Sequence, residues 1–71
     1  MRLSPERLDQ LERAVRDGRR VSVLRRGTEY VVVALRLTTR GGREALVGRL
    51  PMTGEELVFV LDELETFQVV S

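Results

Sequence analysis

One stretch of sequence decides the fold: Glu29-Tyr30-Val31-Val32-Val33-Ala34-Leu35-Arg36-Leu37-Thr38-Thr39, then Arg40-Gly41-Gly42-Arg43, then the run from Glu44 to Leu50. Its β-branched residues predict a long strand, in which alternation places Val31, Val33, Leu35 and Leu37 on one face and Tyr30, Val32, Ala34 and Arg36 on the other. Paired glycines supply the positive φ of a tight turn, so the third run should return antiparallel. Gly48 inside that run indicates a bend, a bulge or a close backbone approach.

The residues before this stretch predict one helix over residues 5–17. Ser4 is a good N-cap, and Pro5 suits the first helical position, where its missing N–H costs nothing. Leu8, Leu11 and Val15 follow the helical spacing of an apolar stripe. Gly18 is the natural residue to end the helix.

Three further short strands complete the predicted secondary structure, at Val21–Arg25, Glu56–Val60 and Thr66–Val70, with a single helical turn at Leu61–Leu64. Five short antiparallel strands are too few for a sandwich, so the sheet must curl to bury one face, and closure would remove its exposed edges. We therefore expect a single mainly β domain, residues 1–71, with one N-terminal helix and a five-stranded antiparallel SH3- or Sm-like small barrel over about 20–70. The expected core is Leu8, Leu11, Val15, Val21, Val23, Val31, Val33, Leu35, Leu46, Phe59, Leu61, Leu64, Phe67 and Val69.

Composition excludes several classes of function. The chain has 71 residues with no Cys and no His, which rules out disulfides, Cys/His zinc sites, thiolate nucleophiles and His proton shuttles. A small barrel offers no deep cleft to raise the pKa of a carboxyl group, and Gly41-Gly42 is not followed by the Lys-Ser/Thr of a phosphate loop. We expect no enzymatic activity, no cofactor and no metal site.

The longest unbroken apolar run is six residues, Tyr30 to Leu35, which is too short to span a membrane. The first residues lack the apolar stretch of a secretory signal, so the sequence predicts a cytoplasmic protein. All 12 basic residues are arginine, which is compatible with a GC-rich or thermophilic source. The small core leaves little surplus stability, and we expect self-association to add burial.

Charge is unevenly distributed along the chain. Residues 1–27 carry a balance of +4, residues 28–54 carry +2 and residues 55–71 carry −5. Guanidinium groups suit bidentate recognition of phosphate or carboxylate, so the arginines predict a surface for nucleic acid or another anionic ligand. The alternative is a solvated face whose arginines pair with Glu29, Glu44, Glu55 or Glu56. The candidate binding residues are Arg19, Arg20, Arg25, Arg26, Tyr30, Arg36, Arg40, Arg43 and Arg49.

The acidic C-terminal segment allows a second hypothesis. Glu55, Glu56, Asp62 and Glu63 are candidates for docking a basic protein partner or an arginine-rich face of another copy. Asp62 and Glu63 could equally cap the short helical turn and contact solvent. The two functional alternatives are therefore nucleic-acid or anion binding through arginines, and a protein–protein adaptor that docks through its acidic segment or a barrel edge.

Most of the chain, from Leu8 to Val70, resembles two small-barrel families of bacterial transcription. It is similar to the WYL domain in the helix and strand of residues 11–21, in the hairpin of residues 42–49 and in the segment of residues 59–65. It is similar to Rof, a family that binds and inhibits the termination factor Rho, in Leu11 to Ala14 and in Leu61-Asp62. The Trp-Tyr-Leu triplet of the WYL domain falls on Glu44-Ala45-Leu46, of which only the Leu is kept. The resemblance implies a small barrel with a role in transcription or RNA metabolism.

Overall fold

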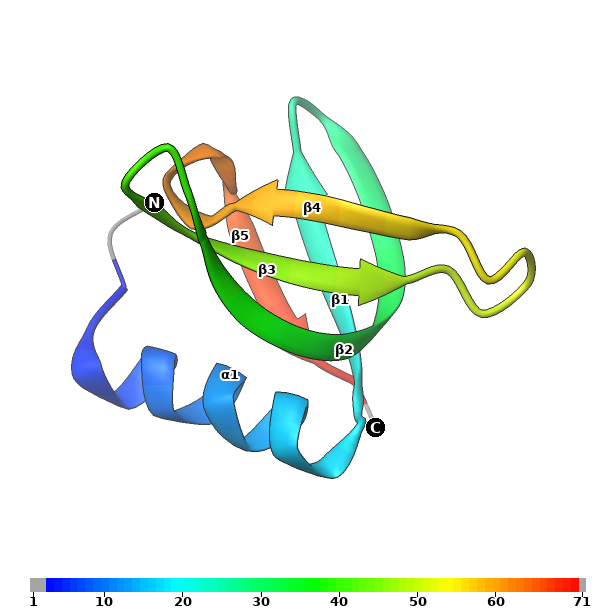
Figure 1. The fold of residues 1–71 in the computed structure, drawn as a ribbon, viewed down its shortest axis with the longest axis horizontal. Helices are drawn as coiled ribbons and strands as arrows, with labels where there is room; N and C mark the ends of the chain where they lie inside the picture. Colours follow the sequence, from blue (N-terminus) through cyan, green and yellow to red (C-terminus); the bar gives the residue numbers. More distant parts are fainter. Residues whose placement is uncertain (1–2, 71) are drawn as a thin grey trace.

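A computed structural model describes residues 3–70 as one helix and one five-stranded antiparallel sheet (Figure 1). The strand order in the sheet is β4-β3-β2-β1-β5. The elements are α1 (Pro5–Asp17), β1 (Arg20–Arg25), β2 (Thr28–Arg40), β3 (Arg43–Arg49), β4 (Glu56–Val60), the 3₁₀ turn η1 (Leu61–Glu63) and β5 (Thr66–Val69). The expected fold class, mainly β with one N-terminal helix, is confirmed.

Helix α1 begins and ends where the sequence predicts. The Ser4 hydroxyl accepts a hydrogen bond from the Arg7 amide at 3.2 Å, and Pro5 occupies the first turn. Gly18 adopts the left-handed conformation at φ 65°, and its N–H bonds to the Val15 carbonyl while the Arg19 N–H bonds to the Ala14 carbonyl. These two bonds form a Schellman motif. Neither α1 nor any other helical segment within residues 3–70 meets the length and hydropathy that a bilayer-spanning helix needs.

The sheet curls around the core, mainly through β2, which bends sharply along its 13 residues (Figure 1). A β-bulge interrupts the pairing of β2 with β3 between Ala34 and Arg36 and strengthens this bend. The expected closure into a complete barrel was wrong, because no backbone pairing joins β4 to β5 within residues 3–70. Both strands are therefore sheet edges.

The bulge also shifts which residues of β2 face the core. Val32 and Ala34 are buried, and beyond the bulge Leu37 packs against the core. The predicted core positions Val31, Val33 and Leu35 were wrong, because strict alternation was assumed through the bulge: Val31 is 41% exposed, and Val33 and Leu35 are half-buried outside the core cluster. Val15 and Val69 are half-buried and pack against the core, whereas the half-buried Leu8 lies outside the core cluster. The other predicted core residues are buried: Leu11, Val21, Val23, Leu46, Phe59, Leu61, Leu64 and Phe67.

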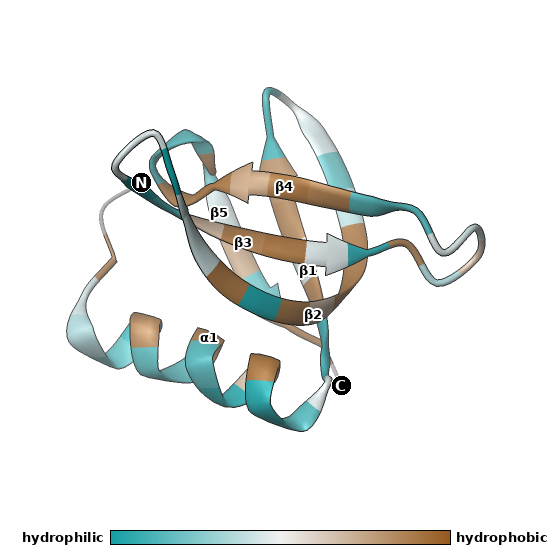
Figure 2. Ribbon diagram, viewed as in Figure 1, coloured by the Kyte–Doolittle hydropathy of each residue, from teal (hydrophilic) through white to brown (hydrophobic). Residues whose placement is uncertain are grey.

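The core lies between the concave side of the sheet and the apolar stripe of α1 (Figure 2). Three residues in register, Leu37, Leu46 and Phe59, form one cross-strand row on this side. The buried residue Gly48 lies against Val32: a Cβ atom built at Gly48 would stand 2.8 Å from the Val32 Cβ and closer still to its Cγ2. Of the three alternatives predicted for Gly48, the structure thus shows a close approach.

Candidate anion-binding surface

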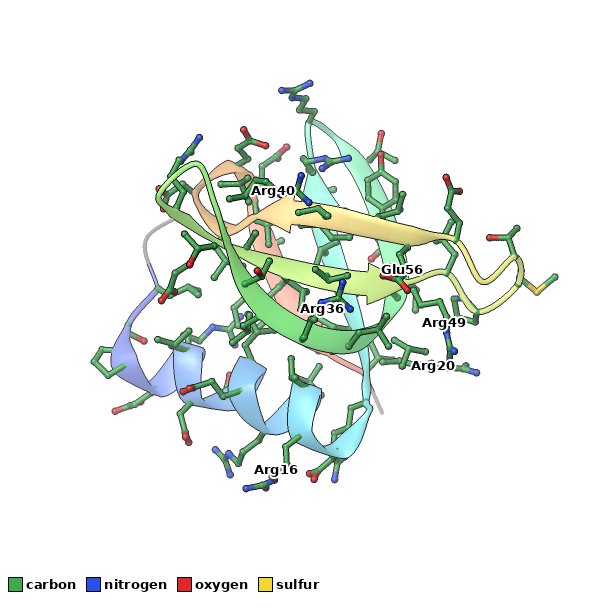
Figure 3. The ribbon with its side chains drawn as sticks, in the orientation of Figure 1. Arg16, Arg20, Arg36, Arg40, Arg49 and Glu56 are labelled. Atoms are coloured by element: carbon green, nitrogen blue, oxygen red, sulfur yellow. The ribbon has the colours of Figure 1, made fainter. Side chains whose placement is uncertain are left out.

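Strand register places several arginines on the outer, convex side of the sheet. Arg20 on β1 and Arg49 on β3 both lie opposite Val33 of β2, and Arg49 lies opposite Glu56 of β4. Residues directly opposite each other in antiparallel strands project to the same side, so these four side chains form one outer row. In Figure 3, Arg20 and Arg49 lie side by side near the end of β3, next to Glu56.

Arg36 belongs to the neighbouring row. It lies opposite Val47, so it is diagonal to Arg49 and does not lie directly across from it. Its Nη2 atom lies 3.5 Å from the Glu56 Oε1 atom, and both side chains are more than half exposed. Arg36, Arg20 and Arg49 therefore gather at one end of the outer face, with Glu56 as the acidic residue among them.

Helix α1 adds arginines to this surface through two adjoining grooves. One groove, of about 490 Å³, lies between α1 and β5 and is lined by Arg13, Arg16 and Arg19 among others. The second, of about 500 Å³, lies between the end of α1 and the outer row and is lined by Arg19, Arg20 and Arg49. Both grooves share Asp17 and Arg19. We call the six exposed arginines of this surface the arginine belt: Arg13, Arg16, Arg19, Arg20, Arg36 and Arg49.

Besides Glu56, two carboxylates hold parts of the belt in weak ion pairs. Asp9 lies 3.1 Å from Arg13, and Asp17 lies 3.2 Å from Arg16 and 3.7 Å from Arg19. The hydrogen bond from Arg16, helped by the charge of both arginines, lowers the pKa of the Asp17 carboxyl below its usual value. Exposed ion pairs of this kind contribute little free energy, so a phosphate can displace them.

Within the belt, Arg20 and Arg49 are the two arginines whose charge is not engaged by a carboxylate of the described residues. Within residues 3–70 neither guanidinium has an ion pair or a hydrogen bond, and both side chains are exposed. The half-buried Val33 lies between them in the row and contributes an apolar side chain to the lining of the second groove. This arrangement, two unpaired guanidinium groups beside an open groove, suits an oxyanion from outside the chain.

Two of the predicted binding residues point to the concave side. The Arg25 guanidinium lies 4.8 Å from the Phe59 ring centroid and 5.3 Å from that of Tyr30, and its Nη1 atom donates to the Val58 carbonyl at 3.2 Å. Tyr30 packs against Phe59 with their centroids 5.3 Å apart. The Tyr30 ring is thus occupied within the fold, with Arg25 above it.

The other predicted residues lie away from the belt. Arg43 sits at the β2–β3 hairpin and faces Asp62 at 3.6 Å and Glu63 at 3.8 Å. Arg40 is at the same hairpin, and Arg26 occupies the β1–β2 turn with φ 52°. Of the expected glutamate partners Glu29, Glu44, Glu55 and Glu56, only Glu56 forms an ion pair within residues 3–70.

The acidic candidates fall at opposite ends of β4. Glu55 and Glu56 lie at its start, and Asp62 and Glu63 lie in the η1 turn after it. Their partners Arg36 and Arg43 hold three of the four in intramolecular ion pairs. The described residues contain no group of three side chains able to hold a metal ion.

Sequence reasoning missed Arg13 and Arg16 as members of the surface. Their spacing of three residues puts both on one helix face, and Arg19 and Arg20 continue the series directly beyond the Gly18 cap. That periodicity was the available signal. The comparison with known protein families and the comparison with curated proteins found no match for this chain.

Proposed function

We propose that this protein is a non-catalytic β-domain that binds the phosphate backbone of a nucleic acid through the arginine belt. The observation that carries the proposal is the meeting of two grooves at Arg19, which links helix arginines to the unpaired Arg20 and Arg49. The belt contains six arginines, and the carboxylates that pair with them are those of Asp9, Asp17 and Glu56. A surface with this excess of guanidinium groups attracts a polyanion and releases its counterions.

The aromatic residues favour contacts with the backbone over contacts with bases. The chain has two Phe and one Tyr. Phe59 and Phe67 are buried, and the half-buried Tyr30 is packed between Phe59 and Arg25. Single-strand binders usually stack bases on exposed aromatic rings, each worth about 1–3 kcal/mol. Without such rings, binding here rests on charge, so it is tolerant of sequence and sensitive to salt.

The cellular role we propose, in transcription or RNA metabolism, follows from the resemblance to small barrels of that setting. An adaptor that docks on a protein through its acidic segment or a barrel edge is the alternative. The positions of the acids give the adaptor less support. They lie at the two ends of β4, and ion pairs to Arg36 and Arg43 already engage three of the four.

The test is fluorescence anisotropy with labelled DNA and RNA oligonucleotides over a series of salt concentrations. The variant R20A/R49A removes two unpaired belt arginines, and we expect it to lower the magnitude of the salt slope on duplex DNA by about 1.8. The matched control R26A/R40A removes two exposed arginines outside the belt and should change the slope much less. Absence of binding at micromolar wild-type protein, or equal losses in both variants, would refute the proposal.

A further inference from the structure

Both edges of the open sheet are covered by an arginine in the same way. At the β5 edge, the Arg7 guanidinium lies 4.0 Å from the Phe67 ring centroid and donates to the Phe67 carbonyl at 2.5 Å. At the β4 edge, Arg25 lies over Phe59 and donates to the Val58 carbonyl. Each arginine thus combines a ring contact with a hydrogen bond to an edge carbonyl. Arg25 extends from β1 to the edge of β4, on the side where β4 and β5 do not pair.

Strand β4 has the composition of a strand that pairs readily. Its residues Glu-Leu-Val-Phe-Val contain four apolar side chains, no Pro and no Lys. The Leu50 N–H bonds to the Glu55 carbonyl, and hydrogen-bonded pairs alternate along an antiparallel ladder. The backbone groups of Leu57 and Phe59 therefore bond to β3, whereas those of Glu56, Val58 and Val60 point to the free side. Natural edge strands of this kind carry a feature that protects them from pairing with another chain. In β4, the Arg25 side chain has this protecting position at the free edge.

The free edge is also self-complementary. A two-fold antiparallel pairing that uses all five residues places Val58 opposite Val58 of a second copy, and Glu56 opposite Val60. No glutamate then faces another glutamate. The centre of this register is the Val58 residue whose carbonyl the Arg25 guanidinium occupies.

We propose that Arg25 closes the β4 edge, and that the partner this edge accepts when Arg25 is removed is the β4 edge of a second copy. Closure of the edge by Arg25 is independent of nucleic-acid binding. At this edge it prevents the self-association that the sequence predicts: the wild-type chain stays monomeric because the central acceptor of the pairing register is already bonded.

The experiment is sedimentation equilibrium over about 10–500 μM protein, roughly a fiftyfold range, on the wild-type chain and on R25M. Methionine keeps apolar volume over Phe59 and Tyr30 but has no N–H to donate to Val58. We expect the wild type to be monomeric over the whole range and R25M to dimerise. The dissociation constant of the R25M dimer should be at least about tenfold lower than the lower limit that the wild-type data set for its own dimer. The matched control R26M places the same side chain at the adjacent, exposed turn position and should remain monomeric.

The variant R25M/V58K tests the register itself. The V58K change sets two positive charges opposite each other at the centre of the pairing and should restore the monomer. Circular dichroism establishes that each variant is folded before its mass is interpreted. A folded R25M that is as monomeric as wild type, a wild type that already dimerises, or an R25M/V58K that stays dimeric would each overturn the inference.

Discussion

Replacing Gly48 by alanine would drive a methyl group into the side chain of Val32. The new Cβ atom would stand 2.8 Å from the Val32 Cβ and 3.4 Å from its Cγ1, with Cγ2 nearer than either. Both residues are buried, on the adjacent strands β3 and β2. Gly48 is outside the left-handed region of φ, so the effect of the substitution is steric and not conformational.

The expected loss follows from two opposing effects. Overpacking a close-packed core costs about 1–3 kcal/mol, whereas removing the flexibility of a glycine from the unfolded chain returns about 0.4–1 kcal/mol. We expect G48A to lose about 1–2 kcal/mol of unfolding free energy. For a domain of this size each kcal/mol lowers the Tm by about 4–8 °C, so circular dichroism melts and urea titrations resolve the change.

A double-mutant cycle separates this steric explanation from others. V32A removes Cγ2, the nearest atom, and Cγ1, while the Val32 Cβ remains 2.8 Å from the new Cβ. V32A should therefore relieve the larger part of the clash, and the losses in V32A and G48A should not add. We expect V32A/G48A to be more stable than the sum of the single losses predicts, by about 1 kcal/mol or more. Additive losses, or a G48A variant as stable as wild type, would refute the assignment of Gly48 as a forced close contact.

Three further predictions concern the helix and the belt. S4A removes the N-cap acceptor of the Arg7 N–H and should cost about 0.5–2 kcal/mol in urea unfolding. Because the pKa of Asp17 is lowered in the folded state, its contribution to stability is present above the ordinary value of 3.8 and is lost as the pH falls through the lowered pKa. D17N should therefore show a weaker loss of stability between neutral and acid pH than wild type, and an equal pH dependence would contradict the ion pairs. E56Q frees Arg36 from its carboxylate and should tighten binding of duplex DNA in the anisotropy assay; weaker binding would place Arg36 outside the site.

The helix could be predicted to the residue because its boundaries are encoded locally. Ser4, Pro5 and Gly18 each act within one turn of their own position, and the structure shows their bonds where the sequence places them. The hairpin at Gly41 and Gly42 is a similar case, since both adopt positive φ. Such signals need no knowledge of the rest of the chain.

The core face of β2 could not be predicted in the same way. The run from Tyr30 to Leu35 is apolar on both sides, so alternation alone gives two equivalent phases. The choice is made by tertiary contacts: Gly48 leaves room for Val32, and the small Ala34 is buried in the core. The bulge beyond Ala34 then exchanges the faces, and nothing in the local sequence marks it.

The candidate site could likewise be predicted only in part. Charge counting identified the arginine-rich part of the chain, but it does not show to which side of the sheet each side chain projects. Arg20 and Arg25 are five residues apart on one strand and therefore lie on opposite faces. Arg20 is exposed beside the groove, whereas Arg25 packs on Phe59 and Tyr30.

Because Arg20 and Arg25 lie on opposite faces, their roles can be distinguished by experiment. An arginine that contacts phosphate changes the salt slope of binding by about 0.9 when it is removed, whereas one that caps an edge carbonyl does not contribute a released counterion. R20A should thus lower the salt slope and leave the chain monomeric, and R25M should change the oligomeric state and leave the slope per protomer unchanged. The same residue type, equally charged and in the same strand, would then serve binding on one side of the sheet and keep the open edge of the fold covered on the other.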